Sequence, residues 1–330
     1  MNQRKPIGII IYTIIIIALC IGVYFLAITF LKPEEKQIGE NTNTVQNEVK
    51  EEEENFASNP IFTKETYPKV DCSTATKPLA KAFSDYFTGE KTPIEEVTSS
   101  KTHGAYVNLI EKKADLILVV DPSEEELMLA QQNNVEFEKI PVVREGFVFY
   151  VNQFNTVEDL TVEQIQNIYT GTTTNWSELG GEDIPITAYQ RPNNSGSQTG
   201  MLSLVMQDKP IMEPKKENIM GDMGSIINMV SEYSNEKSAI GYSYYYYANT
   251  MYKGINQDAA EKIKLLGVNG IKPTNDTIRD GSYPFQTSYY IVIRKDEPEN
   301  SNTRKLVQAM LSAEGQNVAE EAGYVAVTKE

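Results

Sequence analysis

Residues 114–120 read Ala-Asp-Leu-Ile-Leu-Val-Val, a nearly continuous apolar run. Such a run is typical of a β-strand that is buried on both faces of its sheet. Around it, short apolar strands alternate with amphipathic helical stretches. The expected strands are residues 67–71, 146–152, 184–189 and 289–293, and the expected helices are residues 78–87, 106–112, 162–169, 199–206 and 302–321. This alternation predicts an α/β fold with mainly parallel sheets.

Composition excludes several classes of protein. The 330 residues suggest about two domains. With 46 acidic against 30 basic residues, the formal net charge of −16 argues against a nucleic-acid partner, which needs a basic face. His103 is the only histidine, and Cys20 and Cys72 are the only cysteines. A structural zinc site and a disulfide framework are therefore excluded.

The N-terminal end predicts a membrane anchor. Residues 7–31 contain no charge and are longer than the apolar part of a secretory signal, so they predict one transmembrane helix. Arg4 and Lys5 precede the run, which places residues 1–6 in the cytoplasm and the bulk of the chain outside the cell. A leader that is cleaved, or lipidated at Cys20, is the alternative.

The chain beyond the anchor divides into a linker and two lobes. Residues 32–60 are polar and acidic, which predicts a disordered linker. Residues 61–150 together with residues 282–330 are expected to form lobe 1, and residues 151–281 are expected to form lobe 2. Ligands of α/β sheets bind beyond the carboxyl ends of the strands, so we expect a ligand-binding cleft between the lobes.

Two polar loops join an expected strand to an expected helix. Residues 71–78 (DCSTATKP) offer hydroxyl groups beside free backbone N–H groups, which can bind an anion. Residues 191–200 (RPNNSGSQTG) add Gly196, which lets a ligand approach the backbone closely, and the planar guanidinium of Arg191, which matches an oxyanion. Ordinary helix capping is the alternative for both loops.

Asp121 directly follows the buried run. A carboxylate repels a bare anion, but it can accept a hydrogen bond from an anion that still carries a proton. Phosphate near neutral pH has such a proton and sulfate does not. Asp121 therefore suggests a site that prefers phosphate, with a strand-end cap as the alternative.

Five segments resemble the phosphate-binding proteins of ABC transporters, which belong to the type-2 periplasmic-binding-protein superfamily. The resemblance covers about residues 67–327. Cys72 stands where the family commonly has glycine. The segments are VDCSTATKPLA (residues 70–80), YTGTTTNWSELGG (169–181), QRPNNSGS (190–197), SAIGY (238–242), and SAEGQ with GYVAV within residues 312–327.

The resemblance implies a two-lobed type-2 periplasmic-binding-protein fold with a cleft. It also implies that Thr102, within the loop of residues 100–104, supplies a further hydroxyl to the ligand. The phosphate contacts that it implies elsewhere are Ser73, Thr74, Asp121, Arg191, Ser195, Gly196 and Ser197.

The expected function is that of an extracytoplasmic solute-binding protein, which captures inorganic phosphate between two lobes for an ABC-type transporter. Permease subunits are then partners, and no cofactor or metal is needed. A membrane-anchored phosphate or anion sensor, or a surface interaction module with the same fold and no transport role, is the alternative. Thr74 and Lys77 echo the S-x-x-K pair of penicillin-binding enzymes, but S-D-N and K-T-G motifs are absent, so no enzyme is expected.

Overall fold

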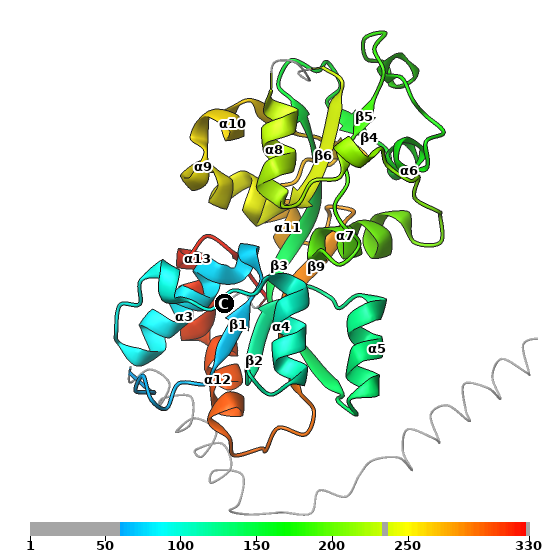
Figure 1. Cartoon of the computed structure of the whole chain (residues 1–330). Helices are drawn as coiled ribbons and strands as arrows, with labels where there is room; N and C mark the ends of the chain where they lie inside the picture. The colour runs from blue at the N-terminus through cyan, green and yellow to red at the C-terminus, as the bar shows by residue number, and fades with distance from the viewer. Residues whose placement is uncertain (1–59, 233–236, 328–330) are drawn as a thin grey trace, which may run out of the picture. The chain divides into compact units, whose positions relative to one another are not determined.

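The computed structural model describes residues 60–232 and 237–327 (Figure 1). All of them belong to one compact unit, residues 53–330. The expected cytoplasmic N-terminus, the transmembrane helix of residues 7–31 and nearly all of the expected linker lie outside the described residues. Among the described residues, no helix has the length and apolar character needed to cross a bilayer.

One long strand connects two groups of strands. Strand β3 (Phe137–Asn152) pairs with β9 (Gln286–Arg294) as far as Gly146, and from Phe147 onward it pairs with β6 (Ala239–Tyr244). Figure 1 shows β3 running through both groups. The full order is β1-β2-β9-β3-β6-β5, in which the remaining strands are β1 (Val70–Cys72), β2 (Leu116–Val119) and β5 (Thr187–Ala188).

Short strands complete the sheets. Two of them pair with β3, namely β7 (Ile263–Leu265) and β10 (Val325–Ala326). A separate two-stranded sheet consists of β4 (Asp159–Leu160) and β8 (Gly267–Val268).

The expectation of mainly parallel sheets was wrong. Among the paired strands of the described residues, β1 with β2, β5 with β6, and β4 with β8 are parallel, whereas β2 with β9, β9 with β3, and β3 with β6 are antiparallel. All four residues of β2 are buried, as the apolar run predicted. Burial on both faces requires only that the sheet is covered on both sides, and it does not fix the direction of the neighbouring strand.

Polar residues and glycines set the ends of the helices. The Thr161 hydroxyl accepts the N–H of Gln164 (3.1 Å) at the start of α6 (Val162–Thr170), and Gly171 ends that helix with a φ of 79°. Such a φ belongs to the left-handed region, where glycine is favoured. The expected helix of residues 302–321 is divided into α12 (Asn302–Leu311) and α13 (Ala313–Glu321), because Ser312 is extended and caps the second one.

The remaining helices are α3 (Lys77–Thr88), α4 (Lys101–Ile110), α5 (Glu124–Gln132), α7 (Gly196–Gly200), which continues as a π-helix (Met201–Met206), α8 (Met223–Ser231), α9 (Tyr252–Ile255), α10 (Gln257–Glu261) and α11 (Asn275–Arg279). Of these, α3, α4 and α7 overlap the expected helices of residues 78–87, 106–112 and 199–206, whereas α5, α8, α9, α10 and α11 were not expected.

Aromatic side chains fill the core where β3 meets β6. The Phe147 ring lies 5.4 Å from the rings of both Tyr242 and Tyr244, and Tyr169 lies 5.7 Å from Tyr242. These edge-to-face and tilted contacts, together with the burial of the rings, stabilise the region. The four consecutive tyrosines that end at Tyr247 are all buried.

Glu145 is buried at the point where β3 changes partners. Its carboxyl group lies beside the N–H of Gly146 (2.8 Å) and the N–H of Tyr246 (3.2 Å). Glu145 is only 2% exposed, and this burial raises its pKa to about 8. Hydrogen bonds from backbone N–H groups oppose the shift. The carboxyl group is therefore protonated in the folded protein at neutral pH.

The raised pKa predicts a pH-dependent stability. The folded protein binds a proton that the unfolded chain releases above the ordinary glutamate pKa of 4.5. This stabilisation is complete below that pH and is lost as the pH rises through about 8. We expect the free energy of unfolding to fall across this window, by up to about 1.4 kcal/mol per pH unit, relative to a Glu145→Gln variant. Denaturant unfolding at several pH values measures this difference, and parallel pH profiles would contradict it.

Candidate functional site

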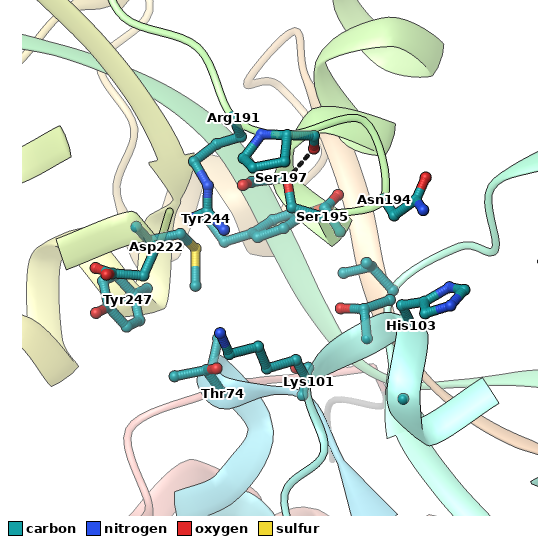
Figure 2. A pocket seen from close by; sticks show the side chains of 18 of the residues that line it. Thr74, Lys101, His103, Arg191, Asn194, Ser195, Ser197, Asp222, Tyr244 and Tyr247 are labelled. Atoms are coloured by element: carbon teal, nitrogen blue, oxygen red, sulfur yellow. Dashed lines mark hydrogen bonds between the residues drawn. The ribbon is translucent and has the colours of Figure 1, made fainter. Parts of the chain in front are cut away.

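A cavity of about 430 Å³ lies where the N-terminal ends of several helices meet (Figure 2). Thr74 begins the 3-10 helix that leads into α3, Thr102 lies in the first turn of α4, and Asp222 caps α8. The first turn of α7 contributes Ser197. The first N–H groups of a helix have no partner within it, and the positive end of its dipole favours a negative charge. The cavity is therefore suited to an anion.

Seven of the eight sequence-predicted site residues come together around this cavity. They are Ser73, Thr74, Thr102, Arg191, Ser195, Gly196 and Ser197. They come from segments that are far apart in the sequence.

Asp121 is the exception, because it is not among the residues that line the cavity. Its carboxylate forms an ion pair with Lys139 on β3 instead. The Lys139 ammonium also lies over the ring of Tyr290, 4.4 Å from its centre. A cation in this position holds the Asp121 carboxylate outside the cavity, so the structure does not place the expected acid at the ligand.

Arg191 is the most informative residue of the cavity. It is only 8% exposed, and within the described residues its Nε and Nη1 atoms have no hydrogen-bond partner and its guanidinium forms no ion pair. Only Nη2 donates, to the carbonyl of Gly221 at 3.2 Å. Burial lowers the pKa of Arg191, and the nearby Tyr242 and Asp222 oppose this shift. A buried, unpaired cation is destabilising by several kcal/mol, so these donors indicate a site for an anion.

The loop that follows Arg191 is shaped by its hydroxyls and its glycine. Ser197 Oγ is buried and has no hydrogen-bond partner in the described structure, so it is available to a ligand. Ser195 Oγ instead donates to Pro192 O (2.9 Å) and accepts the N–H of Gln198 (3.3 Å), so capping accounts for its hydroxyl. The carbonyl of Gly196 accepts the hydroxyl of Tyr244 (2.8 Å), which fixes the loop against β6.

The first loop is fixed in a similar way. The hydroxyls of Ser73 and Thr76 lie 2.9 Å apart, and Thr76 Oγ1 donates to Leu118 O at 2.6 Å. Both hydroxyls thus stabilise the start of the helical segment. The Thr74 hydroxyl forms no hydrogen bond within the described residues and lies at the cavity (Figure 2).

Thr102 does not lie in a loop, as expected, but in the first turn of α4, where it is 8% exposed. A Cβ atom on Gly196 would lie 2.5 Å from Thr102 Oγ1, so these two residues are in close contact across the cavity. The neighbouring His103 also lines the cavity, and its Nδ1 lies 2.9 Å from Glu126 Oε1.

Several polar residues that line the cavity were not among the predicted site residues, including Lys101, Asp222 and Tyr247. Partial burial would raise the pKa of Asp222. Hydrogen bonds from the N–H and hydroxyl of Ser225 outweigh it, and together with the charges of Arg191 and Lys101 they hold the pKa below its usual value. The spacing of Asp222 and Ser225 is a helix-capping signal that could have directed attention to this segment.

A model of the PBP superfamily domain matches residues 58–314. The chain belongs to this superfamily. The family resemblance seen in the sequence is thereby confirmed. A phosphate-binding protein PstS of Staphylococcus haemolyticus is 27% identical over 210 residues, which cover 62% of this chain and 62% of that protein. A PstS of Staphylococcus saprophyticus is 24% identical over 269 residues, which cover 79% of this chain and 80% of the relative.

Solved structures agree with this assignment at the level of the fold. A putative phosphate ABC transporter substrate-binding protein from Clostridium perfringens, with bound phosphate, has a TM-score of 0.60 and 23% identity, and the match covers 78% of this chain and 98% of that one. An ABC-type phosphate transport receptor from Vibrio cholerae has a TM-score of 0.56 and 19% identity, with 78% and 98% covered. These similarities confirm the type-2 α/β fold.

The contact between Gly196 and Thr102 yields a prediction. A Gly196→Ala variant places a methyl group 2.5 Å from Thr102 Oγ1 and 2.8 Å from Val120 Cγ2. Overpacking of this kind costs about 1–3 kcal/mol, so thermal unfolding should show a lower Tm. Gly254→Ala is the matched control, because no atom lies within 4 Å of its added methyl group and alanine favours the helix α9, so its Tm should be unchanged or slightly higher. Equal Tm values for the two variants would contradict the contact.

Proposed function

We propose that this chain is an extracytoplasmic solute-binding protein that captures inorganic phosphate in the cavity for an ABC-type transporter. The observation that carries the proposal is the buried guanidinium of Arg191, whose Nε and Nη1 atoms have no partner within the described residues. These unpartnered N–H groups can donate charge-assisted hydrogen bonds to the oxygens of an oxyanion. Such charge-assisted bonds are roughly twice as strong as bonds between neutral groups.

The groups around Arg191 complete a shell of donors. Ser197 contributes its unpaired hydroxyl, and Gly196 leaves the backbone accessible because it has no side chain. Ser195 holds the loop in place through its cap. On the opposite wall, Thr74 and Thr102 present hydroxyls at the starts of two helical segments. We assign the binding of one phosphate ion to Arg191, Gly196, Ser197, Thr74 and Thr102, whereas Ser73 and Ser195 hold the two loops in place.

The relatives support phosphate, rather than another anion, as the ligand. Several relatives are named phosphate-binding protein PstS, and the similar Clostridium perfringens structure contains phosphate. The chemistry of the cavity agrees, because it offers hydroxyl, N–H and guanidinium donors of the kind that bind oxyanions. The protein then acts by binding without turnover.

The two walls of the cavity belong, in this proposal, to two lobes. Residues 61–150 with 282–330 form one lobe, residues 151–281 form the other, and β3 is the main strand that crosses between them. Small rotations about such a crossing would open and close the walls around the ion, exclude water and strengthen each hydrogen bond. The closed form would then be presented to permease subunits.

The N-terminal segment completes the proposal. Residues 7–31 would anchor the protein in the cell membrane, with residues 1–6 in the cytoplasm and the binding unit outside. Residues 32–60 would act as a flexible tether, because their polar and acidic composition does not support a core. The tether would keep the binding unit near its transporter.

The central role of Arg191 is testable by calorimetry with phosphate. An Arg191→Ala variant loses at least two charge-assisted hydrogen bonds, each contributing about 1.5–3 kcal/mol, so the Kd for phosphate should rise at least 100-fold. Arg304→Ala is the control, because Arg304 pairs with Glu138 (2.9 Å) and does not line the cavity. Unchanged binding by the Arg191 variant, or no phosphate binding by the wild type, would overturn the proposed function.

A further inference from the structure

The cavity contains a second cation that the sequence did not reveal. Lys101 lines the wall opposite Arg191, and Figure 2 shows its side chain extending into the cavity. Within the described residues, Lys101 forms no ion pair or hydrogen bond through its ammonium group. This lysine and Arg191 therefore offer positive charge from two sides.

The backbone of Lys101 supports a specific role. Its φ is 62°, in the left-handed region that a non-glycine residue rarely adopts. Residues with such strained backbones cluster at functional sites, where the surrounding structure keeps them in place. Here the unusual backbone lies directly before Thr102 at the start of α4 and places the lysine side chain at the cavity.

The acids near the cavity offset only part of the charge of Lys101 and Arg191, although both cations interact with Asp222. Asp121 lies outside the lining and pairs with Lys139. Asp222 lines the cavity, but its Oδ1 accepts the N–H of Ser225 (2.7 Å) and its Oδ2 accepts the Ser225 hydroxyl (2.8 Å). Glu126, which faces His103, is not a lining residue. The two positive charges of Lys101 and Arg191 thus outnumber the one negative charge of a lining carboxylate.

We propose that Lys101 binds the anion directly and that the site binds a tetrahedral oxyanion without requiring a ligand proton, so that it accepts sulfate as well as phosphate. This inference rests on the proposed function. A carboxylate facing the ligand would require a ligand proton, which sulfate lacks. An ammonium group has three donors and no acceptor, so it favours ionised oxygens and has no need of that proton. Lys101 lines the site, whereas Asp121 does not.

The test is calorimetry on the full-length chain in mild detergent, with sodium phosphate and sodium sulfate as separate ligands in a chloride buffer. The wild type should bind sulfate with a Kd within about tenfold of that for phosphate, since the main donors are shared. Lys101→Gln should weaken both ligands roughly tenfold or more, and Lys101→Arg should restore them, because it returns the charge.

Three further variants test whether a change in affinity comes from the Lys101 charge at the site. Lys113→Gln removes a lysine that pairs with Glu111 beyond the other end of α4, so it should leave both affinities unchanged. Asp121→Asn should also leave both affinities unchanged. If the Asp121 carboxylate instead accepted a hydrogen bond from a ligand proton, this variant would bind sulfate more tightly than the wild type. Lys101→Gly should keep the wild-type Tm, because glycine adopts the left-handed φ without strain, and should still lose affinity.

The outcomes separate the two proposals. Phosphate binding without sulfate binding, or unchanged affinities in Lys101→Gln, would overturn the role of Lys101 and leave the proposed function intact. A wild type that binds neither ion would overturn both. Sulfate binding that Lys101→Gln weakens, with Lys113→Gln and Asp121→Asn unchanged, would support the inference.

Discussion

The buried, unpaired guanidinium of Arg191 is the constraint on which the account of this protein depends. Taking a cation out of water is unfavourable unless an opposite charge or a full set of acceptors compensates it. The described residues supply one carbonyl, from Gly221, and leave Nε and Nη1 without a partner. The described part of the folded chain therefore lacks a paired negative charge and further hydrogen-bond acceptors for Arg191, and an oxyanion in the cavity would supply both. A binding protein can use this imbalance, because the same donors that destabilise the empty site stabilise the occupied one.

The rest of the structure positions the groups that share the cavity with Arg191. Strand β3 joins the two groups of strands, and the change of partner occurs beside the buried Glu145. The close contact of Gly196 with Thr102 brings α7 and α4 together at the cavity. These are short-range packing constraints, yet they connect residues that are about 90 positions apart in the chain. Local caps then orient the hydroxyls and N–H groups toward the same space.

Local signals in the sequence predicted much of this arrangement. The apolar run of residues 114–120 predicted β2, and the loop of residues 191–200 predicted the Arg191 and Ser197 donors, since both depend on neighbouring residues only. Strand direction could not be predicted, because β9 comes from the far end of the chain. The placement of Asp121 depends on Lys139, which lies in the charged first half of β3 that no periodic pattern revealed. Lys101 was missed because its unusual φ is set by the turn before α4, and a single lysine gives no sign of it.

The most direct measurement is a crystal structure of the protein grown with phosphate. The account predicts one tetrahedral ion in the cavity, with its oxygens roughly 2.7–3.2 Å from guanidinium nitrogens of Arg191 and from Ser197 Oγ. An Arg191 guanidinium that turns to a carboxylate of the protein, with the phosphate ion bound elsewhere or absent, would contradict it.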